Sequence, residues 1–159
     1  MRNDIFEWMG ETDQAVLKKY AAKATGDIVE VGVWKGASSL VMSKANPKAQ
    51  IYSIDNYAHP YEEIYKIAQE TLKGRKNVHL IHKSSGEAAK DWKTKISLLH
   101  IDADHSYEGV CKDIALWKDF VDGYILFHDY TAQVFDVKKA VEENFKEVGL
   151  EGGFAIVKV

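Results

Sequence analysis

The sequence predicts an α/β protein built on a doubly wound, mostly parallel sheet. Strand-like runs of β-branched residues alternate five times with helical patterns, and the last part of the chain changes to two strands around Gly152 and Gly153. Alternating strands and helices favour a parallel sheet with helices on both faces, whereas a glycine hairpin adds an antiparallel strand. We therefore expect one domain over residues 1–159, with a seven-stranded sheet that ends in an antiparallel hairpin strand.

The composition of the chain argues against a nucleic-acid partner and against a membrane-spanning protein. A chain of 159 residues can bury one full core, and a net charge of −3 gives no electrostatic reason to expect nucleic acid. No apolar run reaches the ~20 residues of a membrane span, and the amino terminus lacks the apolar stretch of a signal peptide. Because the single Cys111 cannot form an internal disulfide, we expect a cytoplasmic protein without a membrane partner. A homo-oligomer is compatible with this composition.

The first half of the chain predicts an opening helix and then three strand–helix units. Thr12 or Asp13 can cap the opening helix, and Pro60 is well placed to begin the helix that follows the second strand. In order, the expected elements are a helix over 12–24, a strand over 28–31 with a helix from Ser38, a strand over 51–55 with a helix over 60–73, and a strand over 77–81 with a short helix from Ser84.

The second half predicts two more units and the hairpin. A helical apolar stripe runs from Val110 to Val121, and another begins at Val134, which we expect to be buried. The expected elements are a strand over 96–101, a helix over 107–121, a strand over 123–127, a helix over 134–145, and hairpin strands over 146–150 and 154–159.

The first strand runs into a glycine-containing loop that is typical of ligand binding. Glu30, Gly32 and Gly36 lie in this loop, and a helix begins directly after it. A strand that turns through glycine into a helix presents backbone N–H groups to a ligand. Asp55 ends the next strand about twenty residues further on, where a carboxylate would bind the ribose of a nucleoside. An ordinary turn with a helix-capping aspartate is the alternative.

Polar residues also collect at the ends of the later strands. Ser84 and Ser85 follow the third strand, Asp102 to His105 follow the fourth, and His128 and Asp129 follow the fifth. Ligands of doubly wound sheets bind outside the carboxyl ends of the strands. A random scatter of polar residues would not select five strand ends in succession, so the pattern predicts a binding site at this edge.

With these residues placed, the chain resembles the class I S-adenosylmethionine-dependent methyltransferases, which have a Rossmann-like fold. It is most similar to the small-molecule O-methyltransferases of the macrocin and catechol type. The resemblance covers about residues 28–159. The motifs that carry it are Glu30-Val-Gly32-Val-Trp34-Lys-Gly36-Ala-Ser38, His100-Ile-Asp102-Ala-Asp104-His105, and Ile125-Leu-Phe-His128-Asp129-Tyr130.

The resemblance implies S-adenosylmethionine as the cofactor and a small molecule as the methyl acceptor. Asp55 would accept both ribose hydroxyls, and Asp102 would border the cofactor. The remaining positions implied for the cofactor are Gly32, Trp34, Gly36 and Ser38 at the methionine portion, with Glu30 supporting their loop, and Asn56, Ser84 and Ser85 around the adenine.

The resemblance also implies a base and a divalent metal. His105 occupies the spacing of the catalytic base, with Asp102 beside it, and Asp102 and Asp129 match the two carboxylate ligands of metal-dependent members. Tyr130 stands where the catechol type has an amide ligand. His128 could replace that amide, and a nitrogen ligand suits Zn²⁺ or Mn²⁺ better than Mg²⁺. Capping of the following helix is the alternative for Asp104, and a hydrogen bond to a carboxylate at that helix start is the alternative for His105.

Two other functions remain open at this stage. A nicotinamide-dependent oxidoreductase would use a similar fold, but its loop would read Gly-x-Gly-x-x-Gly, and a second domain would be expected. A non-catalytic cofactor-binding module of a larger assembly would fit the shortness of the chain and the lack of an evident lid.

Overall fold

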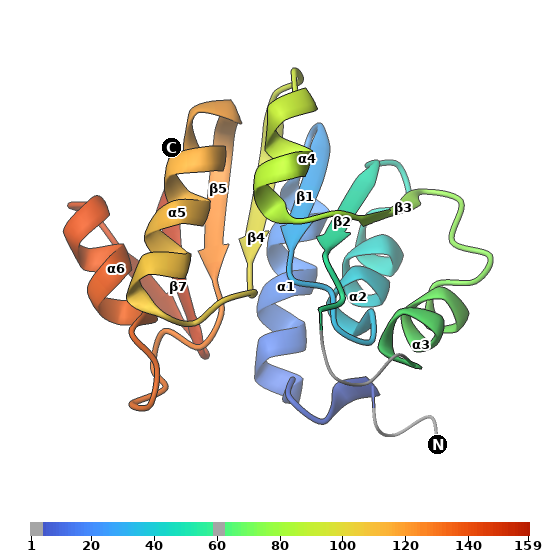
Figure 1. Cartoon of the computed structure of the whole chain (residues 1–159), viewed down its shortest axis with the longest axis horizontal. Coiled ribbons are helices and arrows are strands. Elements are labelled where there is room, and N and C mark those ends of the chain that lie inside the picture. Colours follow the sequence, from blue (N-terminus) through green and yellow to red (C-terminus); the bar gives the residue numbers. More distant parts are fainter. Residues whose placement is uncertain (1–4, 59–62) are drawn as a thin grey trace.

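The computed structural model describes residues 5–58 and 63–159 as an α/β sandwich (Figure 1). Its sheet has the predicted seven strands, and their order is β3-β2-β1-β4-β5-β7-β6. The strands are β1 (Asp27–Val31), β2 (Ile51–Asp55), β3 (Val78–His82), β4 (Ile96–Ile101), β5 (Val121–Phe127), β6 (Gly149–Glu151) and β7 (Phe154–Lys158). The helices are α1 (Glu11–Lys23), α2 (Ala37–Ala45), α3 (Glu63–Thr71), α4 (Ser85–Asp91), α5 (Tyr107–Trp117) and α6 (Val137–Asn144), with a 3₁₀ turn η2 (Lys118–Phe120).

The first five strands are parallel, and the last two form the predicted antiparallel hairpin. β7 pairs antiparallel with both β5 and β6. The strand order reverses between β1 and β4, because β1 leads to β2 on one side while β4 leads to β5 on the other. Ligands of open α/β sheets bind at such a reversal, outside the carboxyl ends of the strands.

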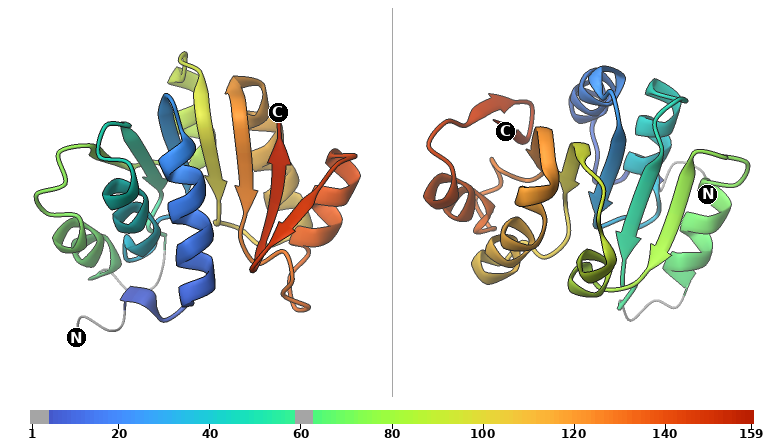
Figure 2. Two further views of the ribbon diagram at one scale, coloured as in Figure 1. Left: turned by 180° about the vertical axis from the view of Figure 1, so that it is seen from behind. Right: turned by 90° about the horizontal axis from the view of Figure 1, so that it is seen from above.

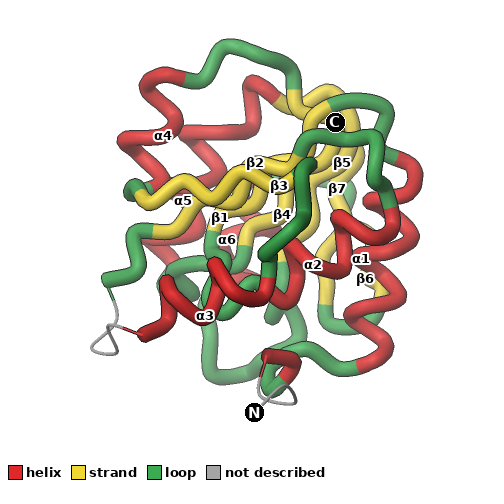
Figure 3. Tube along the Cα trace, turned by 90° about the vertical axis from the view of Figure 1, so that its right-hand side faces the viewer, coloured by secondary structure: helices red, strands yellow, loops and turns green. Residues whose placement is uncertain are grey.

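The sheet lies between two helical layers (Figures 2 and 3). On one face α1 and α2 bury Leu17 and Met42 against Ile28 and Leu98. On the other face the helices α4, α5 and α6 cover a second apolar layer that includes the fully buried Trp117. Because both faces are covered, the central strands are rich in buried β-branched and other apolar residues, apart from the polar row formed by Glu30, Ser53 and His100. None of the described helices is long and apolar enough to cross a membrane.

Several predicted element boundaries were wrong. Gly10 precedes α1 as its N-cap without a side-chain hydrogen bond, so neither Thr12 nor Asp13 caps that helix. α5 ends at Trp117, and Val121 belongs to β5. α6 begins at Val137 rather than Val134, whose side chain is 85% exposed. The predicted helix start at Pro60 lies outside the described residues, and the described part of that helix begins at Glu63.

Candidate functional site

The loop after β1 approaches the end of β4 so closely that Gly32 has no room for a side chain. Gly32 has φ +94°, and a Cβ atom there would lie 2.0 Å from the carbonyl oxygen of Asp102. Gly36, the N-cap of α2, also has a left-handed backbone, as does the non-glycine residue Trp34 with φ 52°. The sharp turn and the close approach are the two backbone features that require glycine.

Asp55 at the end of β2 fixes this loop. Its Oδ2 accepts hydrogen bonds from the backbone N–H groups of Val33 (2.8 Å) and Trp34 (3.0 Å), and its Oδ1 accepts one from Tyr57 N–H (2.7 Å). An ionised carboxylate offers about four acceptor positions. Asp55 therefore shapes the loop with three of them and keeps about one, on Oδ1, for a ligand.

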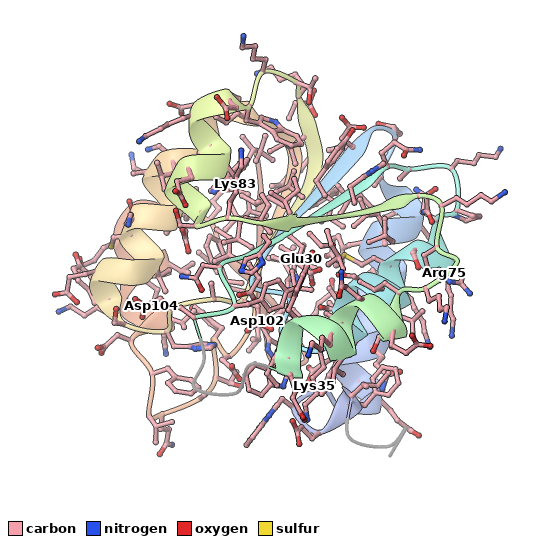
Figure 4. All side chains as sticks on the ribbon, turned by 45° about the vertical axis from the view of Figure 1, so that its right-hand side comes forward. Glu30, Lys35, Arg75, Lys83, Asp102 and Asp104 are labelled. Atoms are coloured by element: carbon pink, nitrogen blue, oxygen red, sulfur yellow. The ribbon has the colours of Figure 1, made fainter. Side chains whose placement is uncertain are left out.

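Glu30 lies beneath the loop in a buried polar row. It is directly opposite Ser53 of β2 and His100 of β4, and all three side chains are fully buried. Glu30 accepts a short hydrogen bond from Ser39 Oγ of α2 and lies 3.2 Å from His100 Nδ1. Figure 4 shows Glu30 near the middle of the molecule. Burying a carboxylate is costly unless it is paired, and these contacts supply the pairing and link β1 to the start of α2.

Two carboxylates and two imidazoles meet where β4 and β5 end. His105 Nε2 lies 3.3 Å from Asp102 Oδ1 and 3.0 Å from Asp129 Oδ2. His128 Nδ1 lies 3.3 Å from Asp102 Oδ2 and 3.6 Å from Asp129 Oδ2. On its other side, His128 Nε2 lies 3.6 Å from Asp13 Oδ2 of α1. We call Asp13, Asp102, His105, His128 and Asp129 the acid–imidazole cluster.

Each imidazole of the cluster is held in its charged form. Hydrogen bonds to Asp102 and Asp129 raise the pKa of His105 to about 9. Burial alone would lower the pKa of His128, but Asp102 and the neighbouring carboxylates raise it to about 9. Burial alone would raise the pKa of Asp102, yet its hydrogen bonds with both histidines hold that pKa well below the usual range. Near neutral pH both imidazoles of the cluster therefore carry a positive charge.

Comparison with known families decides the class of this site. A family profile described as "Methyltransferase domain" matches residues 29–130, more than half of the chain. The chain belongs to this methyltransferase family. The matched segment contains the loop, Asp55 and most of the acid–imidazole cluster, so the prediction of a methyltransferase enzyme is confirmed.

Solved structures with the same fold include other methyltransferases. SAH-bound methyltransferase PaMTH1 of Podospora anserina superposes with a TM-score of 0.76 at 13% identity, over 96% of this chain and 80% of its own. The O-methyltransferase of Bacillus cereus in complex with SAH superposes with a TM-score of 0.76 at 13% sequence identity, over 95% of this chain and 82% of its own. Precorrin-6y C5,15-methyltransferase of Geobacter metallireducens superposes with a TM-score of 0.68 at 15% sequence identity, over 94% of this chain and 87% of its own. No curated protein sequence gives a significant match.

The methyltransferase uses its two predicted adenine-edge serines in hydrogen bonds of its own. Ser84 forms a capping box with Glu87 at the start of α4. Ser85 Oγ donates to Asp113 Oδ1 (2.6 Å) and accepts from Trp117 Nε1 (2.9 Å). Both residues follow β3 at the edge where Asn56 follows β2, and the carbonyl oxygen of Asn56 lies 3.1 Å from His82 Nε2. Their contact with adenine stays a prediction.

Two other predicted residues, Ser38 and Asp104, lie at the starts of helices. Ser38 is buried in the first turn of α2, 5% exposed. Asp104, in contrast, accepts a hydrogen bond from Ser106 N–H (2.9 Å) at the start of α5, and Figure 4 shows it away from Asp102. Among the described residues, the group that could hold a metal ion consists of Asp102, His128 and Asp129, without Asp104.

Sequence reasoning missed three residues of the site. Asp13 was interpreted as a helix cap, although it contacts His128 and accepts a hydrogen bond from Gly153 N–H (3.1 Å). The hydroxyl group of Tyr57 is buried without a hydrogen-bond partner among the described residues. Phe135 stacks on His105 with ring centroids 4.4 Å apart. The left-handed backbone of Tyr57 has no clear signal in the sequence. The contacts of Asp13 with His128 and of Phe135 with His105 join residues far apart in the sequence, so they have no local signal either.

Proposed function

We propose that this methyltransferase transfers the methyl group of S-adenosylmethionine to a hydroxyl group of a small-molecule acceptor, as in O-methyltransferases of the macrocin and catechol type. The observation that carries the proposal is the juxtaposition of the Asp55-braced loop with the acid–imidazole cluster. Gly32 of the loop touches the backbone of Asp102, which belongs to the cluster. A cofactor on the loop would therefore lie beside groups that can bind and move a proton.

The residues of the loop fit the proposed cofactor. A Cβ atom at position 32 would meet the backbone of Asp102, so glycine lets the loop lie directly against the end of β4, where the cofactor is proposed to bind. The free acceptor position on Asp55 Oδ1 can take a ribose hydroxyl in a charge-assisted hydrogen bond. This geometry supports one such bond with the present loop, rather than the two that the resemblance implies. The sulfonium of the cofactor supplies an electrophilic methyl group.

Within the cluster, His105 is suited to receive the acceptor proton. Its side chain is 28% exposed, and its Nε2 lies between Asp102 and Asp129, which orient the ring and stabilise its charged form. Because the pKa of His105 is about 9, roughly one imidazole in a hundred is neutral at pH 7. Proton removal should therefore become faster as the pH rises toward 9. Holding the hydroxyl beside the loop supplies the alignment that an in-line displacement needs.

A divalent metal ion is a further part of the proposal, and the residues fit it. Asp102, His128 and Asp129 each offer one ligand atom, all within 4.8 Å of one another. Ligands at the usual ~2.0–2.2 Å would need only a small contraction. One nitrogen and two oxygen donors favour Zn²⁺ or Mn²⁺ over Mg²⁺. Such an ion would lower the pKa of a bound hydroxyl. It would also replace the charge of the two imidazolium ions, so its binding should release protons.

Calorimetry with S-adenosylhomocysteine tests the cofactor assignment. We expect a dissociation constant in the micromolar range, about −8 kcal/mol. Asp55→Ala should weaken binding by ~1.5–3 kcal/mol, since it removes the one hydrogen bond that a ribose hydroxyl can donate to this charged group. The matched control is Asp91→Ala, because Asp91 is an exposed carboxylate at the end of α4. Binding of NAD, with no binding of either sulfonium or thioether ligand, would overturn the proposal.

A further inference from the structure

The turn before α1 is fastened to the loop after β1 by a carboxylate. Glu7 Oε1 accepts hydrogen bonds from Lys35 Nζ (2.7 Å) and from the indole Nε1 of Trp34 (3.3 Å). These hydrogen bonds hold the pKa of Glu7 below its usual value. The backbone N–H of Trp34 is held at the same time by Asp55 Oδ2 (3.0 Å). Trp34 is therefore fixed twice, its main chain by the end of β2 and its side chain by the turn.

The backbone of Trp34 explains why such support matters. Its φ of 52° lies in the left-handed region, which is unfavourable for a residue with a side chain. Residues of this kind persist where several contacts determine their conformation together. The hydrogen bond from the indole to Glu7 is one of these contacts. The ion pair of Glu7 with Lys35 is another, and the Lys35 side chain is only 14% exposed.

The turn itself is anchored in the apolar core. Met9 is buried, 8% exposed, in the cluster that joins α1 and α2 to the sheet, and Phe6 packs against the same cluster. The N–H of Met9 donates to the carbonyl oxygen of Phe6 (3.1 Å), and Gln14 Nε2 of α1 donates to the carbonyl oxygen of Met9 (3.4 Å). Because the residues on both sides of it are packed, Glu7 starts from a fixed place.

The same segment also reaches the acid–imidazole cluster. Asp13, in the first turn of α1, places its Oδ2 3.6 Å from His128 Nε2. In Figure 1 the turn and the start of α1 lie at the end of the molecule to which the parallel strands point, and Figure 4 shows Lys35 at that end as well. One short stretch of chain therefore contacts the loop with one carboxylate and the cluster with another.

We propose that residues 6–13 form a strap that positions the loop after β1 for cofactor binding, and that Glu7 is the positioning residue through which the strap acts. This inference rests on the proposed function. A loop that adopts its binding conformation for only part of the time binds with an affinity reduced by that fraction. Loss of the Glu7 carboxylate would release the Trp34 indole and leave the Lys35 ammonium without this counter-charge.

The expected effect falls on cofactor binding and spares the chemical step. Glu7→Ala should weaken S-adenosylhomocysteine binding about five- to tenfold, the combined size of a partly exposed ion pair and one hydrogen bond. Glu7→Gln keeps an acceptor for the indole and should restore part of the affinity. The kcat value at saturating S-adenosylmethionine should stay nearly constant in both variants, because Glu7 contacts none of the residues of the acid–imidazole cluster that hold the proton.

The indole signals in ¹H–¹⁵N NMR spectra test the contact directly. The Trp34 signal is identified by its loss in Trp34→Phe. We expect this signal to shift and to exchange faster with water in Glu7→Ala. The indole signal of Trp92 is the internal control, because Trp92 Nε1 donates to the carbonyl oxygen of Thr94 (2.8 Å) and should not respond. An unchanged Trp34 signal in Glu7→Ala would refute the strap.

Calorimetry then separates a positioning role from a merely structural one. Glu70→Ala is the matched control, because it removes an exposed glutamate–lysine pair (Glu70 and Lys73, 3.3 Å) at the end of α3 and should bind as wild type does. If Glu7 acts through the indole, Trp34→Phe should weaken binding less in the Glu7→Ala background than in wild type. Strictly additive losses would refute action through Trp34. A lower Tm with unchanged affinity would assign Glu7 to the scaffold.

The same titrations keep this inference apart from the proposed function. If wild type binds the thioether and Glu7→Ala binds it equally well, the strap is wrong and the cofactor assignment survives. Absence of thioether binding by wild type would refute the proposed function, and the role of the strap with it.

Discussion

Replacement of Gly32 by alanine offers a quantitative test of the contact between the loop and β4. Gly32 has φ +94°, and the added Cβ would lie 2.0 Å from the Asp102 carbonyl oxygen, whose backbone is held in the sheet. The left-handed backbone costs a residue with a side chain ~1–2 kcal/mol. Overpacking against fixed atoms adds ~1–3 kcal/mol. We therefore expect Gly32→Ala to reduce the free energy of unfolding by about 2–5 kcal/mol.

Gly74→Ala is the matched control for this test. Gly74 has a similar φ of +79°, but a Cβ atom there would meet nothing within 4 Å. Its substitution should cost only the backbone term of ~1–2 kcal/mol and leave S-adenosylhomocysteine affinity unchanged. Urea denaturation of both variants gives the two free energies, and calorimetry gives the affinities. If the two variants lose equal stability, or if Gly32→Ala binds the thioether as wild type does, the close approach of the loop to β4 has no such role.

Three further predictions concern the acid–imidazole cluster. His105→Ala should lower the single-turnover rate by ~10²–10⁴-fold with cofactor affinity retained; full activity in a destabilised variant would assign His105 to the scaffold. Because the pKa of His105 and His128 is raised from 6.5 to about 9, their stabilisation is complete below pH 6.5 and lost as the pH rises through 9. Urea denaturation of the protein in the presence of a chelator should therefore show that the free energy of unfolding falls by ~1–3 kcal/mol between pH 6.5 and 9.5. A free energy of unfolding that does not change over this range would contradict the ion pairs between these histidines and the carboxylates. Exhaustive chelation should reduce turnover if Asp102, His128 and Asp129 bind a metal, and full activity without metal would exclude that role.

The loop and the strand ends were predictable because their signals are local. The residues from Glu30 to Gly36 combine a buried strand, left-handed turns and a helix start within a few positions, and Asp55 follows at the spacing of one strand–helix unit. The parallel sheet then brings successive strand ends to one edge without any further information. For this reason the meeting of Asp102 and Asp129 could be expected before the structure was known.

The conformation of the loop before α6 and the contacts of Asp13 were not predictable, because they depend on packing between distant segments. Val134 continues the apolar stripe of α6 in sequence, yet the chain before Val137 wraps around His105 instead of completing a helical turn. Periodicity cannot distinguish a helix start from an apolar loop next to it. Asp13 looks like an N-cap, but its partners are 115 and 140 positions away (128 − 13 and 153 − 13). Such contacts have no local signal.

The bridge made by Asp13 joins segments near the two ends of the chain to the acid–imidazole cluster. The three hydrogen bonds of Asp55 that brace the loop all join residues between positions 33 and 57. The surroundings of His128 depend on α1 and on the turn at Gly153, and both lie outside the matched segment 29–130. A chain without its final hairpin would keep every residue that forms the three hydrogen bonds of Asp55, but it would lose Gly153, which donates a hydrogen bond to Asp13 beside His128.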